Sequence, residues 1–253
     1  LGLGLHLNLT EGAPVTPPGR VPALVDRQGL FHPIVIQLRR IANGRTPLAE
    51  VERELRAQFE LILARGVQPT HVDGHLHVHA WARVLPLVAR LMVDYGVRAM
   101  RSPFLTAWLP LHLAARPAAH AGLAPAPAAP SLLDRFCPLV TPWGGRVWSV
   151  RDGRGPDRRG PRAGLLRRRG VITTDFMLDS GQFLGTPDPA GALLAALRPL
   201  RAATVELMAH PAWNRDEGRG AAEVALLTDP RLRDALVGAG VRLTNYGRLR
   251  VEE

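Results

Sequence analysis

Apolar and polar residues alternate at the start of the chain. Leucine fills every second position there, at Leu3, Leu5, Leu7 and Leu9. Successive side chains of an extended strand point to opposite faces. The pattern therefore predicts a strand with one apolar face, and it places His6 on the other face. A loop rich in Gly and Pro follows at residues 11–22.

Further along, the apolar residues recur every three or four positions instead of every two. Residues 47–65 show this period with charged residues between, which predicts an amphipathic helix. Thr46 and Pro47 suit its start and Gly66 its end. Other helices are predicted near 80–95, 190–200 and 229–237, and strands near 70–79, 97–100, 170–177, 204–208 and 241–247. This alternation is typical of an α/β fold with a parallel sheet or barrel.

One predicted strand carries an unusual row of side chains. Within THVDGHLHVHAW (70–81), every second residue is His or Asp, namely His71, Asp73, His75, His77 and His79. In a strand all five would point to the same face. Imidazole and carboxylate groups are the usual ligands of Zn²⁺ and related ions. A solvated polar run is the alternative, but the clustering favours a metal or catalytic site.

The composition is that of an ordinary globular protein. With 253 residues, 46% of them hydrophobic and 21% charged, the chain can form one domain of barrel size. No run of 18 or more apolar residues suggests a membrane span, and no secretory signal is visible. The single cysteine, Cys137, excludes an internal disulfide framework and fits a reducing compartment. The cytoplasm is therefore the expected location.

The net charge of +10 invites a nucleic-acid hypothesis. All the basic residues are arginine, however, and this composition is typical of a GC-rich genome. Many arginines lie in residues 146–169, a Gly- and Pro-containing segment that we interpret as a solvated insertion. Residues 107–145, rich in Ala and Pro, are predicted to form a second such stretch. A nucleic-acid partner is thus only a minor hypothesis.

Three predicted strands end near potential ligands: His6, the histidine row, and Glu206 with His210. In parallel α/β barrels the functional groups gather at the carboxyl ends of the strands. His6 and His75 could share one ion, which would polarise a carbonyl group and activate water. A carboxylate and a histidine could then act as general base and acid. This chemistry suits hydrolysis of an amide, an ester or a phosphoester, and the residues alone do not choose among them.

Four segments resemble one family, the YdjC-like carbohydrate deacetylases. They are GLHLNLTEG (4–12), THVDGHLHVH (70–79), YGVRAMRSP (95–103) and VELMAHPAW (205–213). The family includes chito-oligosaccharide deacetylases and hopanoid-associated relatives. The resemblance covers nearly the whole chain except the two low-complexity stretches. It implies a deformed (β/α) barrel that removes acetyl groups from N-acetylated amino sugars with a bound divalent ion.

The resemblance also implies roles for individual residues. His6 and His75 match the two histidine ligands of the metal, which is Mg²⁺ or Zn²⁺. His210 matches a histidine near the scissile bond, a candidate general acid or oxyanion partner. Asp73 is a candidate catalytic carboxylate, or it orients a neighbouring histidine.

The same comparison predicts a substrate-binding set of residues, His77, His79 and Arg101. The expected partner is an N-acetylated sugar, no membrane contact is expected, and a homodimer is one option for the assembly.

One family feature is absent. The family begins with a strand that ends in Asp-Asp-Phe-Gly and supplies a metal-binding aspartate, and this chain starts after that point. We therefore expect a single deacetylase domain, residues 1–253, that is truncated and lacks its first βα unit. Two alternatives remain open. One is an inactive relative that binds sugar or metal, and the other is a metal-dependent phosphoesterase or amidohydrolase.

Overall fold

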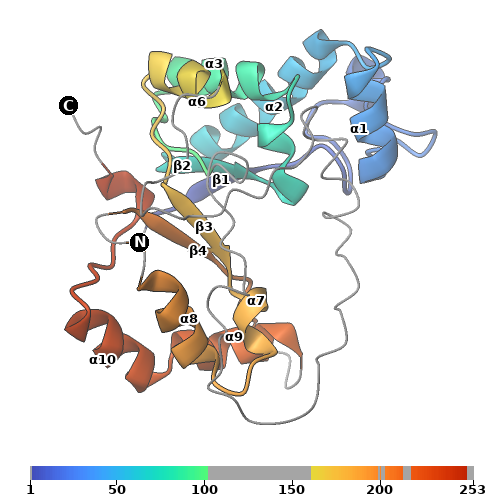
Figure 1. Ribbon diagram of the computed structural model, residues 1–253. Coiled ribbons are helices and arrows are strands. Elements are labelled where there is room, and N and C mark those ends of the chain that lie inside the picture. The colour runs from blue at the N-terminus through green and yellow to red at the C-terminus, as the bar shows by residue number, and fades with distance from the viewer. Residues whose placement is uncertain (1, 102–160, 199, 201–202, 213–217, 250–253) are drawn as a thin grey trace. The chain divides into compact units, whose positions relative to one another are not determined.

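The computed structural model describes residues 2–101, 161–198, 200, 203–212 and 218–249 (Figure 1). These residues form two compact units. The first unit contains residues 2–101, 161–173 and 244–249, and the second contains the described residues between 174 and 243. The prediction of a single domain over 1–253 stays a prediction.

The first unit is built on parallel strands. β1 (Gly4–Leu7) pairs with β2 (His71–Gly74), and the register places His6 beside Asp73. Residues 98–101 continue the ladder on the other side of β2, because Val72 N donates to Ala99 O at 2.9 Å. Ile172 then pairs with this third segment through a parallel bridge. Four chain segments thus run in parallel, which brings His6, Asp73 and Arg101 to neighbouring positions.

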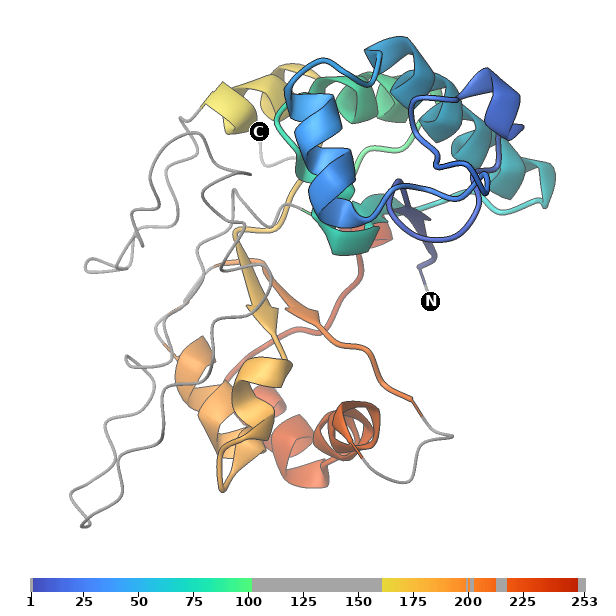
Figure 2. The same cartoon turned by 90° about the vertical axis from the view of Figure 1, so that its right-hand side faces the viewer.

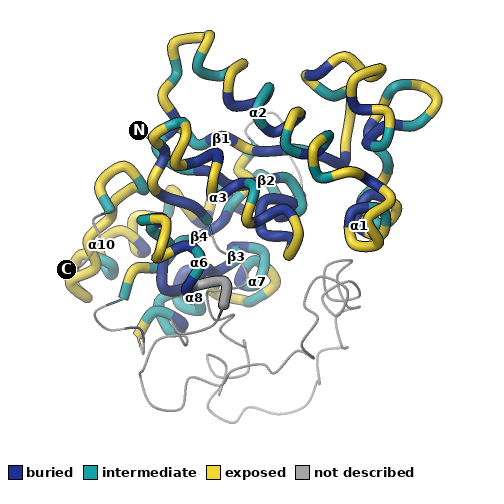
Figure 3. Tube along the Cα trace, turned by 90° about the horizontal axis from the view of Figure 1, so that it is seen from above, coloured by how far each residue is buried: buried dark blue, intermediate teal, exposed yellow. Residues whose placement is uncertain are grey.

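Helices follow these strands along the chain. They are α1 (Ile34–Ala42), α2 (Leu48–Ala64), α3 (Leu85–Asp94) and α6 (Pro161–Arg168), with the short 3₁₀ helices η1 (Pro18–Arg20), η2 (His75–Ala80) and η3 (Tyr246–Arg248). The predicted amphipathic helix is α2, and its apolar residues Val51, Leu55 and Phe59 are completely buried. Burial of such residues is the main stabilising contribution to the unit. Buried stretches appear dark blue in Figure 3.

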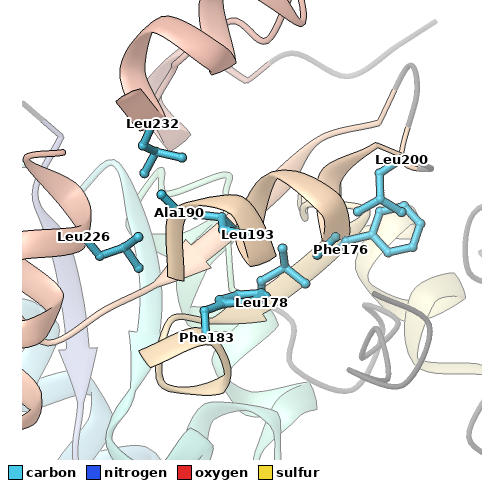
Figure 4. Packing of buried hydrophobic residues seen from close by; sticks show 9 residues of the cluster. Phe176, Leu178, Phe183, Ala190, Leu193, Leu200, Leu226 and Leu232 are labelled. Atoms are coloured by element: carbon cyan, nitrogen blue, oxygen red, sulfur yellow. The ribbon is translucent and has the colours of Figure 1, made fainter. Parts of the chain in front are cut away.

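The second unit has its own parallel pair and its own core. β3 (Phe176–Asp179) pairs with β4 (Val205–Met208). The helices are α7 (Gly181–Leu184), α8 (Pro189–Leu197), α9 (Arg219–Leu227) and α10 (Pro230–Gly238). Buried apolar residues of β3 and all four helices form one cluster, in which Leu178 of β3 and Leu193 of α8 point toward each other (Figure 4). This core supports the ends of β3 and β4.

Most predicted elements are confirmed at least in part. The strand predicted over 170–177 is displaced, because β3 begins only at Phe176 and Ile172 forms an isolated bridge. The strand predicted over 70–79 stops at Gly74. Residues 241–247 form no strand, since η3 begins at Tyr246 and the preceding residues are irregular and mostly exposed. Part of the predicted insertion 146–169 is helical as α6, because buried Leu166 anchors it. The rest of that insertion up to residue 160, and the stretch 107–145, lie outside the described residues. α1 and α9 were not predicted.

The fold class is confirmed at the level of a parallel α/β protein. Within the described ranges the strands form two separate parallel pairs extended by isolated bridges, and they do not close into a barrel. The deformed barrel therefore stays a prediction. No helix in the described part of the chain is long and apolar enough to cross a membrane.

Candidate active site

A sharp bend divides the histidine row. After Gly74 the chain enters η2, and Leu76 and His77 adopt left-handed conformations with φ values of 48° and 57°. Such values are costly for residues other than glycine, so surrounding contacts must hold them. The bend destroys the alternation expected of a strand. The prediction that all five polar side chains share one face is therefore wrong.

The first histidine of the row faces the C-terminal segment. The ring of His71 stacks on Tyr246 with centroids 4.3 Å apart and planes inclined by 21°. Its Nδ1 lies 3.0 Å from Oγ1 of Thr70. His71 thus packs against Tyr246 of the C-terminal segment at the start of β2.

Asp73 links two strands and the segment beside them. Its Oδ1 accepts a hydrogen bond from Nδ1 of His6 at 2.8 Å, and its Oδ2 lies 2.8 Å from Nη1 of Arg101. The carboxylate and the guanidinium are nearly buried, with 12% and 14% of their side chains exposed. Burial alone would raise the pKa of Asp73, but the His6 hydrogen bond and the Arg101 charge hold that pKa below its ordinary value. Asp73 is therefore ionised near neutral pH.

The Asp73 contact fixes the tautomer of His6. An ionised carboxylate can only accept hydrogen bonds, so Nδ1 of His6 carries the proton. The lone pair of this imidazole then lies on Nε2. A carboxylate that orients a histidine in this way is a common support for a metal ligand.

His75 lies beside His6 and faces an acidic side chain. The two imidazole rings are 5.9 Å apart between centroids, edge to face at 72°. Nε2 of His75 is 3.1 Å from Oε1 of Glu11. That nitrogen is shielded from solvent, yet the contact is not directed as a hydrogen bond. Glu11 was not predicted as a site residue, although it lies in the same GLHLNLTEG segment as His6.

The loop that carries Glu11 is tied to α2. Gln58 pairs with the main chain of Asn8 in both directions, at 3.0 and 2.7 Å. The Asn8 side chain in turn accepts from the backbone N of Thr10 at 2.9 Å and of Glu11 at 3.2 Å. Glu54, completely buried on α2, accepts hydrogen bonds from the next stretch of the loop. Side chains of α2 therefore fix the loop after β1 through hydrogen bonds to its main chain.

The last two histidines of the row are buried. His77 and His79 lie edge to face with centroids 6.2 Å apart, and 6% and 0% of their surfaces are exposed. Nε2 of His79 donates to the carbonyl oxygen of Arg101 at 2.8 Å. His79 therefore holds the main chain of the residue that pairs with Asp73. Contact of these two side chains with a sugar stays a prediction.

Burial makes His79 sensitive to acid. Desolvation lowers the pKa of this imidazole from 6.5 to about 3. Unfolded chains bind a proton at pH values where the native protein does not, so acidification favours unfolding. Between pH 6.5 and 3, we therefore expect the free energy of unfolding to fall by about 1.4 kcal/mol for each unit that the pH is lowered, because unfolding takes up one proton at His79. Denaturant unfolding at several pH values should show a shallower slope for His79→Gln, and an unchanged slope would contradict this.

Gly74 makes the close packing of His79 possible. A Cβ at this position would lie 2.7 Å from Nδ1 of His79 and 3.1 Å from the carbonyl oxygen of Leu7. Gly74→Ala should therefore lower the free energy of unfolding by about 1–3 kcal/mol, as overpacking does elsewhere. Gly19→Ala is the matched control, because a Cβ there meets nothing within 4 Å. Equal stability of the two variants in urea would refute the assignment.

His210 and Glu206 belong to the second unit. Glu206 lies within β4 and is partly buried, whereas His210 follows the strand with an exposed side chain. The backbone N of His210 donates to Oε2 of Glu223 at 2.5 Å. Sequence reasoning did not identify Glu223. No clear signal marked it, because the helix that carries it, α9, was not predicted either.

The nitrogen donors of His6 and His75 show how well the first unit would suit a metal ion. His6 presents Nε2 with its lone pair, and the shielded Nε2 of His75 has no directed hydrogen bond. Two such imidazoles fit a divalent ion. Among the residues that the structure describes, no third His, Cys, Asp or Glu joins them at ligand geometry. The donor set fits a metal in part, with Glu11 beside His75 as a possible oxygen donor.

The fold and site define a parallel α/β protein with paired imidazoles and a buried carboxylate at the ends of its strands. The family model described as YdjC-like protein matches residues 1–237. The chain belongs to this family, which confirms the resemblance stated above.

Curated relatives carry names of one enzymatic class. A carbohydrate deacetylase of Mus musculus is 30% identical over 270 residues, a match that covers 95% of this chain and 75% of the relative. A carbohydrate deacetylase of Danio rerio is 38% identical over 120 residues, covering 44% of this chain and 37% of the relative. A chitooligosaccharide deacetylase of Enterobacter is 40% identical over 102 residues, covering 40% and 38%. The last two matches thus span about two fifths of the relative's length.

A solved structure shares the fold. A crystal structure from Enterococcus faecalis, whose name proposes cleavage of cellobiose phosphate, has a TM-score of 0.63 and 23% identity. The similarity covers 97% of this chain and 77% of that protein. At this identity the match supports the fold alone.

Proposed function

We propose that this protein is a metal-dependent hydrolase that removes acetyl groups from N-acetylated amino sugars, including chito-oligosaccharides. The family and the names of its relatives support a carbohydrate deacetylase. The observation that carries the proposal is the hydrogen-bonded series Arg101–Asp73–His6 with His75 beside it. It leaves two imidazole nitrogens available to bind a metal ion.

In this proposal His6 and His75 hold the ion, which is Mg²⁺ or Zn²⁺. When bound, such an ion polarises the acetyl carbonyl and increases the acidity of water. Asp73 keeps His6 in the required tautomer and orientation. Both of its oxygens are already bonded and its pKa is lowered, so it is a weak base. We therefore assign Asp73 to positioning rather than to proton transfer.

Roles are also proposed for His210, from the family resemblance, and for Glu11. His210 has an exposed imidazole after β4 and is assigned as the general acid that protonates the leaving amine. Glu11, next to His75, is assigned as an added oxygen donor near the ion. The guanidinium of Arg101 forms an ion pair with Asp73. Contact of Arg101 with substrate stays a prediction.

The decisive experiment measures acetate released from N,N′-diacetylchitobiose by metal-stripped protein, before and after Mg²⁺ or Zn²⁺ is added back. We expect release only with metal, and its loss on chelation. p-Nitrophenyl phosphate tests the phosphoesterase alternative in parallel. Metal-independent turnover, or turnover of the phosphate alone, would reject the proposed function. Metal binding without turnover of either substrate would favour a binding protein.

A further inference from the structure

Helix α9 forms hydrogen bonds with the segment that carries His210 at two points. Oε2 of Glu223 accepts a hydrogen bond from the backbone N of His210 at 2.5 Å. One helical turn earlier, the carbonyl oxygen of Gly220 accepts from the backbone N of Ala212 at 3.3 Å. Between these contacts lies Pro211, whose ring restricts its own φ. The main chain of residues 210–212 is thus fixed from both ends.

Burying the charged side chain of Glu223 costs free energy. Its side chain is completely buried, and burial alone would raise the pKa of its carboxyl group. The hydroxyl of Ser180 donates to Oε1 at 2.6 Å and Nε of Arg219 donates to the same oxygen at 2.8 Å. Together with the His210 amide, these donors hold the pKa below its ordinary value, so the group stays charged. A buried charge survives only when its partners are held in place.

The network joins the ends of both strands to one helix. Ser180 directly follows β3, and its backbone N donates to the carbonyl oxygen of Met208, the last residue of β4, at 2.9 Å. Arg219 also pairs with Asp179, the last residue of β3. Glu223 therefore fixes His210 relative to a rigid pair of strand ends.

The imidazole of His210 has little else to orient it. The side chain is exposed, and within the described residues its ring forms no hydrogen bond. Its direction therefore depends on the main chain to which it is attached. The close approach of α9 adds to this restraint, because a Cβ at Gly220 would lie 2.6 Å from Cβ of Ala212.

We propose that Glu223 is a positioning residue for His210, acting through the backbone amide of His210, and that the close approach at Gly220 completes the same clamp. The inference rests on the proposed role of His210 as general acid. It adds a specific cause for the placement of that group, because Glu223 of α9 contacts His210 at its backbone amide.

The test variant is Glu223→Gln. A glutamine has one accepting oxygen, and Ser180 and Arg219 both donate to the position of Oε1. The amide NH₂ group is therefore directed at the backbone N–H of His210, where two donors oppose each other. Asp175→Asn is the matched control. Asp175 is also nearly buried in the second unit, but it accepts from Thr204, before β4, rather than from His210.

Two measurements are made on the full chain. In ¹H–¹⁵N spectra the His210 amide of the wild type should be shifted downfield and protected from exchange, and Glu223→Gln should remove both properties. With diacetylchitobiose, Glu223→Gln should lower kcat by about 10-fold or more with little change in KM, as expected when a catalytic group is misplaced. Asp175→Asn should leave the His210 amide unchanged. Gly220→Ala, which displaces Ala212 without removing a charge, should lower kcat in the same way.

The outcomes separate this inference from the proposed function. An unprotected His210 amide in the wild type overturns the clamp without any variant having to fold. An unchanged kcat in Glu223→Gln, or an equal loss in Asp175→Asn, overturns the positioning role. If the wild type releases no acetate, the proposed function fails, and the amide measurements alone decide whether Glu223 fixes His210.

Discussion

Replacing His75 with alanine is expected to lower the affinity for a divalent ion at least about 100-fold, because it removes one of the two proposed imidazole ligands. Nε2 of His75 is shielded from solvent and has no directed hydrogen bond, which suits a nitrogen reserved for an ion. Titration calorimetry with Mg²⁺ and Zn²⁺ measures this affinity without relying on activity. Acetate release should fall in parallel.

The control for this variant is His71→Ala. His71 belongs to the same row, but its ring stacks on Tyr246 instead of lying beside His6. Its removal should loosen residues 244–249 and leave metal affinity within about twofold, since it contributes no proposed ligand. Unchanged metal affinity in His75→Ala, or equal losses in both variants, would remove His75 from the metal site.

Asp73→Asn should produce the second large effect, on both stability and metal binding. The change leaves the guanidinium of Arg101, 14% exposed, without its carboxylate partner. Breaking a buried pair in this way typically costs about 3–5 kcal/mol of unfolding free energy. The variant also loses control of the His6 tautomer, so metal affinity should fall about 10–100-fold. Denaturant unfolding and calorimetric titration measure the two effects.

A surface pair provides the control for Asp73→Asn. Nη2 of Arg56 lies 3.4 Å from Oδ2 of Asp94, and both side chains are about two fifths exposed. Asp94→Asn should therefore change stability by less than about 1 kcal/mol, as exposed ion pairs do. If the two variants lose equal stability, the Asp73–Arg101 pair is not the buried anchor that its geometry indicates.

The pH dependence of the Asp73 contribution has a definite sign. The pKa of Asp73 in the native protein is lowered from an ordinary value of 3.8. The carboxylate then stabilises the fold fully above that value, and the contribution is lost as the pH falls through the lower native pKa. The stability difference between wild type and Asp73→Asn should therefore be constant near neutral pH and shrink below about pH 4. A difference that grows on acidification would contradict the assignment.

The regular elements could be predicted because their signals are local. The alternation around Leu5 and Leu7 specifies β1, and the three- and four-residue period of Val51, Leu55 and Phe59 specifies α2. These patterns work because burial of one face is the dominant stabilising term for a strand or a helix. α1 was missed even though it buries such a face through Leu38 and Ile41.

The bend in the histidine row shows where local reasoning ends. Alternation predicted one strand over 70–79, yet Leu76 and His77 adopt left-handed conformations that neither residue favours. Contacts far apart in sequence accompany this conformation: His79 bonds to the Arg101 carbonyl, and Asp73 pairs with Arg101 and His6. No pattern within 70–81 contains that information.

The sequence by itself determined the α/β class and the helices and strands with clear periods, and it supplied the candidate metal ligands, because each depends on residue type and local spacing. The tertiary structure decided which of those residues meet. It placed Asp73 between His6 and Arg101, turned His79 inward, and buried Glu223 against the His210 amide. These choices depend on non-local pairing of charges and hydrogen bonds, since a buried polar group is stable only with partners that the fold supplies.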